Sequence, residues 1–291
     1  MIEARVPAFH QVIAPRAGIV QVLSGLGSPR GIVCSRTGIV RFADTARDKV
    51  YEYSIPRWQH APDGGVLRPH PLEIKGAFGL TLDHQGRLLI AGRDPAQVAR
   101  IEVDGTLHAL TQASQPGHPR HPCGVIYAID ASIYVADLPP AHSGNSASGA
   151  IYQIARSGMI RPVSTIPLRP AGVALDCRQL NLLAADQLSG AVLRFPVAPD
   201  GALGSPVTVF ERPVPDAGRS GGIETDEAGN IYVTTPEGVH VYNTDGIELG
   251  AVRLPEPPAD LCWGRGAIGL YVTAGSSLYF IPTESRGTRT F

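Results

Sequence analysis

The sequence predicts an all-β protein: a six-bladed β-propeller with four antiparallel strands in each blade. The first observation is a short phrase that returns about every 45 residues, and the second is the strand pattern that follows each copy. The copies begin at residues 28, 76, 121, 169, 219 and 257 and read SPRGIVCS, GAFGLTLD, HPCGVIYA, RPAGVALD, RSGGIETD and PPADLCWG. Strand-rich repeats of this length are typical of propeller blades.

Each repeat has the same internal order. The phrase opens a strand, a polar turn follows, and a second strand such as ASIYVAD or GNIYVTT comes next. A third strand such as KVYEYSI or GAIYQIA and a weaker fourth complete the blade. Period-2 alternation, β-branched residues and Gly/Asp/Asn turns indicate strands and hairpins. A β-sandwich would not repeat one phrase at this period, and solenoid repeats are usually shorter.

The ends of the chain are expected to close the ring. The last repeat is short of a fourth strand, and an unassigned strand, GIVQVL, precedes the first phrase. We therefore expect residues 18–23 to complete the last blade, which removes a free sheet edge. Residues 1–291 then form a single propeller domain.

The composition is typical of a soluble globular protein. A net charge of −1 with 18% charged residues argues against a nucleic-acid partner or an anionic membrane. No signal peptide or membrane span is recognised, and four dispersed cysteines are typical of free thiols, so we expect a cytoplasmic protein. A Cys34–Cys262 disulfide is left open. The expected state is a monomer or weak homodimer, and no motif for a nucleotide, flavin or haem cofactor is present.

One position of the phrase varies while its frame is kept. In a propeller the first strand of each blade lines the central channel, so these variable residues should form a ring at one mouth. The adjacent glycine lets neighbouring backbones crowd there. The six variable residues are Arg30, Phe78, Cys123, Ala171, Gly221 and Ala259.

The fifth repeat, GGIETDEAGNIYVTTPEGVHVYNTDGIELGAVRLPE, resembles the gluconolactonase/regucalcin (senescence marker protein) lactonases. The resemblance covers nearly the whole chain and implies a six-bladed propeller with a divalent cation on the channel axis. In that family the ligands are a Glu, two Asn and an Asp; the corresponding positions here are Arg30, Cys123, Ala171 and Gly221. Calcium needs six to eight oxygen ligands, and these side chains offer none. We therefore expect no metal site.

Arg30, His121 and Cys123 are candidate catalytic residues. Arg30 can replace the cation and bind a carboxylate or an oxyanion, or it can pair with an acidic neighbour such as Asp44. His121 and Cys123 flank Pro122 and should point the same way, as a base and a nucleophile. The alternative is a small buried thiol that fills space. A zinc site with His118 is weaker, because three ligands so close in sequence rarely surround one ion.

The aspartates that end three second strands are further candidates. Asp137 and Asp186, with Asp44 as their counterpart, should lie at the rim, where one can serve as general acid or base. The alternative is that these carboxylates bind backbone amides of a neighbouring loop, and the recurrence in three blades favours it.

Substrate contacts are expected from Phe78, Ala171, Ser220, Gly221, Asp260 and His142, and Trp263 can add to an aromatic wall. The loop at 138–150 can be a lid or a mobile tip. We expect a metal-independent enzyme acting on a small organic molecule in the central pocket. Lactone or ester hydrolysis and a cyclisation, condensation, elimination or isomerisation in secondary metabolism both remain open, as does a non-catalytic small-molecule binder.

Overall fold

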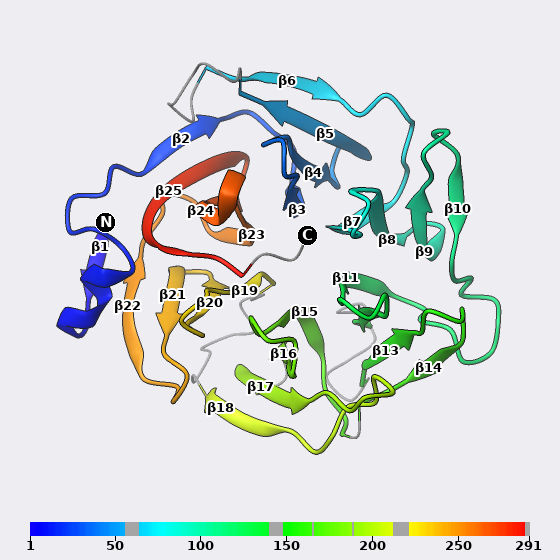
Figure 1. Cartoon of the computed structure of the whole chain (residues 1–291). Coiled ribbons are helices and arrows are strands. Elements are labelled where there is room, and N and C mark those ends of the chain that lie inside the picture. The colour runs from blue at the N-terminus through cyan, green and yellow to red at the C-terminus, as the bar shows by residue number, and fades with distance from the viewer. Residues whose placement is uncertain (56–63, 140–147, 165, 188, 212–220, 289–291) are drawn as a thin grey trace.

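A computed structural model gives the arrangement of the chain, and it describes residues 1–55, 64–139, 148–164, 166–187, 189–211 and 221–288. Within these residues six antiparallel sheets stand around a common axis (Figure 1). The six-bladed propeller predicted from the repeats is therefore confirmed. Helical structure in the described residues is restricted to two short 3-10 helices, η1 (Pro7–Gln11) and η3 (Arg265–Ala267).

Each blade is a meander whose first strand lies innermost. Blade one comprises β3 (Pro29–Cys34), β4 (Val40–Asp44), β5 (Lys49–Ser54) and β6 (Val66–Pro69). Blade two comprises β7 (Ala77–Leu82), β8 (Leu88–Arg93), β9 (Ala96–Ile101) and β10 (Leu107–Ala109). Blade three comprises β11 (Pro122–Tyr127), β12 (Ile133–Asp137), β13 (Ala150–Ile154) and β14 (Ile160–Pro162). Blade four comprises β15 (Pro170–Leu175), β16 (Asn181–Asp186), β17 (Ala191–Pro196) and β18 (Val207–Glu211).

The last two blades incorporate the N-terminal segment. Blade five comprises β19 (Ile223–Thr225), β20 (Ile231–Thr235), β21 (Gly238–Tyr242) and β22 (Glu248–Val252), and β1 (Ile2–Ala4) adds a fifth strand to its edge. Blade six comprises β23 (Pro258–Trp263), β24 (Ile268–Ala274), β25 (Ser277–Arg286) and β2 (Val20–Leu23). The pairing of β2 with β25 confirms that the N-terminal strand closes the ring, whereas the fifth strand on blade five was not predicted.

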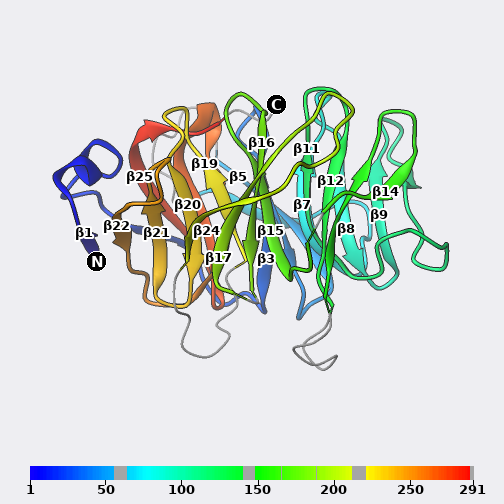
Figure 2. The ribbon, with the colours of Figure 1, turned by 90° about the horizontal axis from the view of Figure 1, so that it is seen from below.

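The core fills the spaces between adjacent sheets rather than one central volume. Phe42, Tyr134, Tyr232 and Phe195 are fully buried there. Trp263 joins blades five and six, because its ring packs edge-on against Tyr232 at 5.0 Å and its Nε1 donates to the backbone oxygen of Thr225 at 2.8 Å. In the side view the sheets stand roughly parallel to the axis (Figure 2). The first strands are therefore held apart by packed side chains and enclose a channel.

Adjacent blades approach closely at a ring that we call the neck, formed by the residue after each variable position. A Cβ added to Gly31, Gly79 or Gly172 would collide with a backbone carbonyl of the next blade. Glycine therefore permits this close approach. The neck consists of Gly31, Gly79, Gly124, Gly172, Gly222 and, in the sixth blade, Asp260.

Candidate functional site

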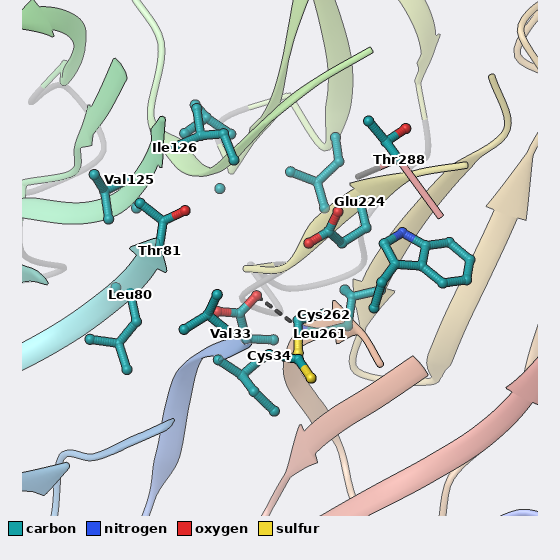
Figure 3. A pocket seen from close by; sticks show the side chains of 18 of the residues that line it. Val33, Cys34, Leu80, Thr81, Val125, Ile126, Glu224, Leu261, Cys262 and Thr288 are labelled. Carbon is teal, nitrogen blue, oxygen red and sulfur yellow. Dashed lines mark hydrogen bonds between the residues drawn. The ribbon is translucent and has the colours of Figure 1, made fainter. Parts of the chain in front are cut away.

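A cavity of about 640 Å³ occupies the channel from the neck to the turns between the first and second strands. Its wall comes from the first strands of all six blades and the turns that follow them (Figure 3), and it combines apolar with polar surface. The aliphatic and aromatic lining residues include Ile32, Val33, Leu80, Val125, Ile126, Val173, Ile223, Leu261 and Trp263. This volume fits a small organic molecule.

Two acidic side chains, Glu224 and Asp260, lie among the aliphatic side chains of the first strands. Glu224 is in β19 and Asp260 is in β23, the first strands of adjacent blades, and both line the cavity. Figure 3 shows the Glu224 carboxyl directed toward the cavity interior. The pairing of two carboxyl groups in an enclosed site makes them candidates for proton transfer.

The pKa values of these two carboxyl groups are raised to different extents. Burial, followed by the negative charge of Asp260, raises the pKa of Glu224 to about 8. Burial also raises the pKa of Asp260, but only to about 6, because backbone amides of Leu261, Ile32 and Gly31 and the nearby Arg30 charge favour its ionised form. Near pH 7 Glu224 is therefore mainly protonated and Asp260 mainly ionised.

Asp260 also explains why the sixth phrase lacks its glycine. A β-bulge lies between Arg30 and Ile32 in blade one, and the backbone amides of Gly31 and Ile32 lower the pKa of Asp260 across the blade boundary. The Asp260 carboxylate accepts a hydrogen bond from Leu261 N at 2.9 Å. The side chain thus joins blades six and one at the neck while it faces the cavity.

Arg30 lies beside an aromatic ring, that of Phe78, and an acidic group, the carboxyl of Asp260. Its guanidinium carbon is 5.4 Å from the centre of the Phe78 ring, and its charge lowers the pKa of Asp260. Asp260 is thus an acidic neighbour of Arg30, whereas Asp44 accepts backbone hydrogen bonds from Gly27 and Ser28 at 2.7 and 2.8 Å. Arg30 and Phe78 do not belong to the lining of the 640 Å³ cavity and lie on the other side of the neck.

Cys123 lines the cavity with its thiol turned into the wall. Its Sγ lies 3.4 Å from the backbone oxygens of Ala136 and Pro170, between blades three and four. Burial raises the pKa of this thiol to about 12. A thiol with that pKa is a poor nucleophile, so the geometry supports the space-filling interpretation of Cys123.

His121 and the rim aspartates are arranged around backbone amides. The Asp137 carboxylate accepts a hydrogen bond from the backbone of His121, and burial raises the pKa of Asp137. Asp186 accepts from Arg169 N at 2.7 Å, just before the first strand of its own blade, in the same way that Asp44 accepts from Gly27 and Ser28. This repeated arrangement supports the loop-binding interpretation of the three aspartates.

The remaining predicted substrate contacts divide into two groups. Ala171, Gly221 and Asp260 line the cavity, and Trp263 adds an aromatic wall. Ser220, His142 and most of the loop at 138–150 lie outside the described residues. All four cysteines are free thiols, so Cys34 and Cys262 form no disulfide, although they are neighbours on adjacent blades.

The four positions where the resemblance implies metal ligands do not fit a divalent cation. Ala171 and Gly221 offer no donor atom, Cys123 is protonated and directed at carbonyl oxygens, and Arg30 would repel the ion. Across the described ranges, no three His, Cys, Asp or Glu side chains are grouped so that they could hold a metal. No helix among these residues is long and apolar enough to cross a membrane.

Two residues of interest were missed by the sequence analysis. Glu224 follows the variable position of the fifth phrase by three residues, and a charged residue in a strand that should face the channel was an available signal. Arg93, at the end of β8, has its guanidinium carbon 3.8 Å from the centre of the Phe78 ring. No periodic pattern pointed to Arg93, since it lies outside the repeated phrase.

Comparisons with known proteins agree with the fold. A gluconolactonase from Zymomonas mobilis subsp. mobilis is 21% identical over 230 residues, which is 73% of this chain but 64% of that protein. The structure of a gluconolactonase from Xanthomonas campestris is similar with a TM-score of 0.83 at 19% identity, covering 97% of this chain and 94% of the other. Regucalcin from Agrobacterium tumefaciens strain C58, described as a calcium-binding protein, gives a TM-score of 0.72 at 14% identity, covering 90% and 92%.

The family assignment rests on the sequence itself. Residues 124–276, more than half of the chain, match the sequence model of the SMP-30/Gluconolactonase/LRE-like region. The matched segment begins within the third phrase and contains the fourth, fifth and sixth phrases, and the described residues have the propeller architecture of the similar structures. The chain therefore belongs to the SMP-30/gluconolactonase/LRE-like family.

Proposed function

We propose that this protein hydrolyses a small lactone or ester in the central cavity and that Glu224 and Asp260 supply the acid–base chemistry. The observation that carries the proposal is the pair of carboxyl groups with separated pKa values facing one cavity. Such a separation is the usual basis for assigning an acid and a base. Membership of a family that includes gluconolactonases favours hydrolysis over other reactions of a small molecule.

Asp260 is the proposed general base. At neutral pH its carboxylate takes a proton from water as the water oxygen forms a bond to the substrate carbonyl carbon. The Leu261 amide donates to the carboxylate, and the amides of Gly31 and Ile32 also favour its ionised form. Because a carboxylate has about four acceptor positions, at least one remains for the water. The Arg30 charge beside it favours the ionised form that a base requires.

Glu224 is the proposed general acid. Its protonated carboxyl donates to the alkoxide oxygen as the bond between that oxygen and the carbonyl carbon breaks, which releases a hydroxy acid from a lactone, or an acid and an alcohol from an ester. Proton transfer from Asp260 to Glu224 through solvent restores the starting state. No step passes through a metal, because the residues at the implied metal positions do not fit one.

The aliphatic side chains of the wall indicate the kind of substrate. A polyhydroxylated sugar lactone needs many hydrogen-bonding partners, whereas each of the six blades contributes at least one branched aliphatic side chain to the wall of this cavity. We therefore propose a substrate with an alkyl or aryl body rather than a sugar.

Variants of the two carboxyl groups test the proposal. We expect the wild type to hydrolyse at least one member of a panel of alkyl-substituted γ- and δ-lactones and p-nitrophenyl esters. Glu224→Gln and Asp260→Asn should each lower kcat/KM by roughly 100-fold or more. Glu227→Gln, an exposed neighbour outside the cavity, is the matched control and should not change turnover. A wild type that hydrolyses no member of the panel, or variants with unchanged kcat/KM, would refute the proposal and leave the binding-protein alternative.

A further inference from the structure

Two arginines converge on one aromatic ring at the neck. Arg30 in β3 and Phe78 in β7 occupy variable positions of the first two blades, and Arg93 ends β8. The guanidinium carbons lie 5.4 Å (Arg30) and 3.8 Å (Arg93) from the centre of the Phe78 ring. All three side chains are only partly buried, so a small molecule can reach them. We call these three residues the arginine cluster.

Arg93 has hydrogen-bonding capacity that its surroundings do not use. Its Nε is buried and has no hydrogen-bond partner within the part of the chain that the structure describes. The same residues provide no carboxylate within ion-pair distance of its guanidinium. A buried N–H donor without an acceptor is costly.

Asp137, whose carboxyl is influenced by the charge of Arg93, and Asp260, which is influenced by the charge of Arg30, are already engaged with backbone amides. Asp137 accepts hydrogen bonds from the amides of Arg120 and His121, and Asp260 accepts them from amides of blades one and six. The Cys123 thiol also contacts Arg93, but burial raises its pKa to about 12, so it carries no charge at neutral pH. The positive charge of Arg93 is thus not neutralised by a direct carboxylate contact among the described residues.

We propose that the arginine cluster is a binding site for a small organic carboxylate with a flat apolar body. The carboxylate would accept hydrogen bonds from Arg93 with support from the charge of Arg30, and the apolar body would stack against Phe78. The sign of the charge at this end of the channel is therefore the reverse of that needed for a cation. The proposal rests on the cluster alone and does not require hydrolysis in the cavity.

Benzoate and benzamide are suitable probes, because they have nearly the same shape but only benzoate is charged. Calorimetric titration of the wild type should detect benzoate and give much weaker binding of benzamide. Arg93→Met keeps an apolar side chain against Phe78 and should weaken benzoate binding roughly 10-fold or more. Arg93→Lys should restore part of the affinity, since the charge returns without the planar fork. Arg68→Met, which removes an exposed arginine from the outer strand β6, is the control and should bind benzoate as the wild type does.

Equal affinity for benzoate and benzamide, or unchanged benzoate affinity in Arg93→Met, would overturn this proposal. Thermal unfolding of every variant checks folding, and Arg30→Met supplies a second test if Arg93→Met does not fold. Neither probe is an ester or a lactone, so the result is separate from turnover. A protein that binds benzoate through Arg93 but hydrolyses nothing refutes only the hydrolytic proposal, and the reverse result refutes only the carboxylate site.

Discussion

At the scale of single residues, neighbouring backbone amides give two similar carboxyl groups different protonation states. Asp260 accepts amide hydrogen bonds that stabilise its charge, so burial raises its pKa only to about 6. Glu224 has one amide, from Thr225, acting in that direction, together with the repulsion of Asp260, and its pKa rises to about 8. The difference follows from the bulge in β3, which supplies amides to blade six but not to blade five.

The raised pKa of Glu224 makes protein stability depend on pH. The unfolded chain ionises this carboxyl near its ordinary pKa of 4.5, whereas the folded chain keeps it protonated up to about pH 8. Its contribution to stability is therefore complete below about pH 4.5, falls as the pH rises, and is lost above about pH 8. Glu224→Gln cannot ionise, so its Tm relative to the wild type should be higher at pH 9 than at pH 5. A Tm difference that is the same at both pH values, measured by calorimetry, would contradict the assigned pKa.

At the scale of elements, the first strand of each blade has two roles: it approaches the backbone of the next blade at the neck, and it lines the cavity. The glycine after the variable position serves the first role, because its missing Cβ leaves room for a carbonyl of the next blade. The residues that follow, such as Val173 and Ile223, serve the second. These two constraints explain why the repeated phrase keeps its glycine while the neighbouring residues vary.

Gly172→Ala tests the neck. The new Cβ would collide with the Gly221 carbonyl of blade five, which is backbone and cannot turn aside. We expect a loss of about 1–3 kcal/mol in the free energy of unfolding, as in other overpacked sites. Gly18→Ala is the matched control, since a Cβ there meets no heavy atom within 4 Å. Equal denaturant midpoints for the two variants would show that the blades are not in close contact at the neck.

At the scale of the whole molecule, the fold could be predicted because the same sequence pattern occurs once in each blade. Six copies of one phrase specify six similar blades, and the missing outer strand of blade six indicated the role of the N-terminal strand. The fifth strand on blade five could not be predicted, since Ile2–Ala4 is short and its place depends on an exposed edge of β22.

The candidate site was less predictable than the fold, because a channel collects side chains from blades that are distant in sequence. The recurrence of Asp44, Asp137 and Asp186 indicated their contacts with backbone amides. In contrast, the role of Glu224 depends on its distance from Asp260 and on the aliphatic side chains around both, and the position of Arg93 depends on the exit of β8 beside Phe78. These are properties of the closed ring and not of any single repeat.

The pH dependence of kcat/KM is the most direct test of the central claim that Glu224 and Asp260, rather than a metal ion, carry out the chemistry. The measurement uses the best substrate of the lactone and ester panel, with EDTA present throughout. Asp260 must be ionised and Glu224 protonated, so activity should rise near pH 6, fall near pH 8 and lie highest between them. The residual activity of Glu224→Gln should not fall near pH 8, because the glutamine cannot ionise. Loss of activity in EDTA, or a rate that continues to rise through pH 9, would contradict the account.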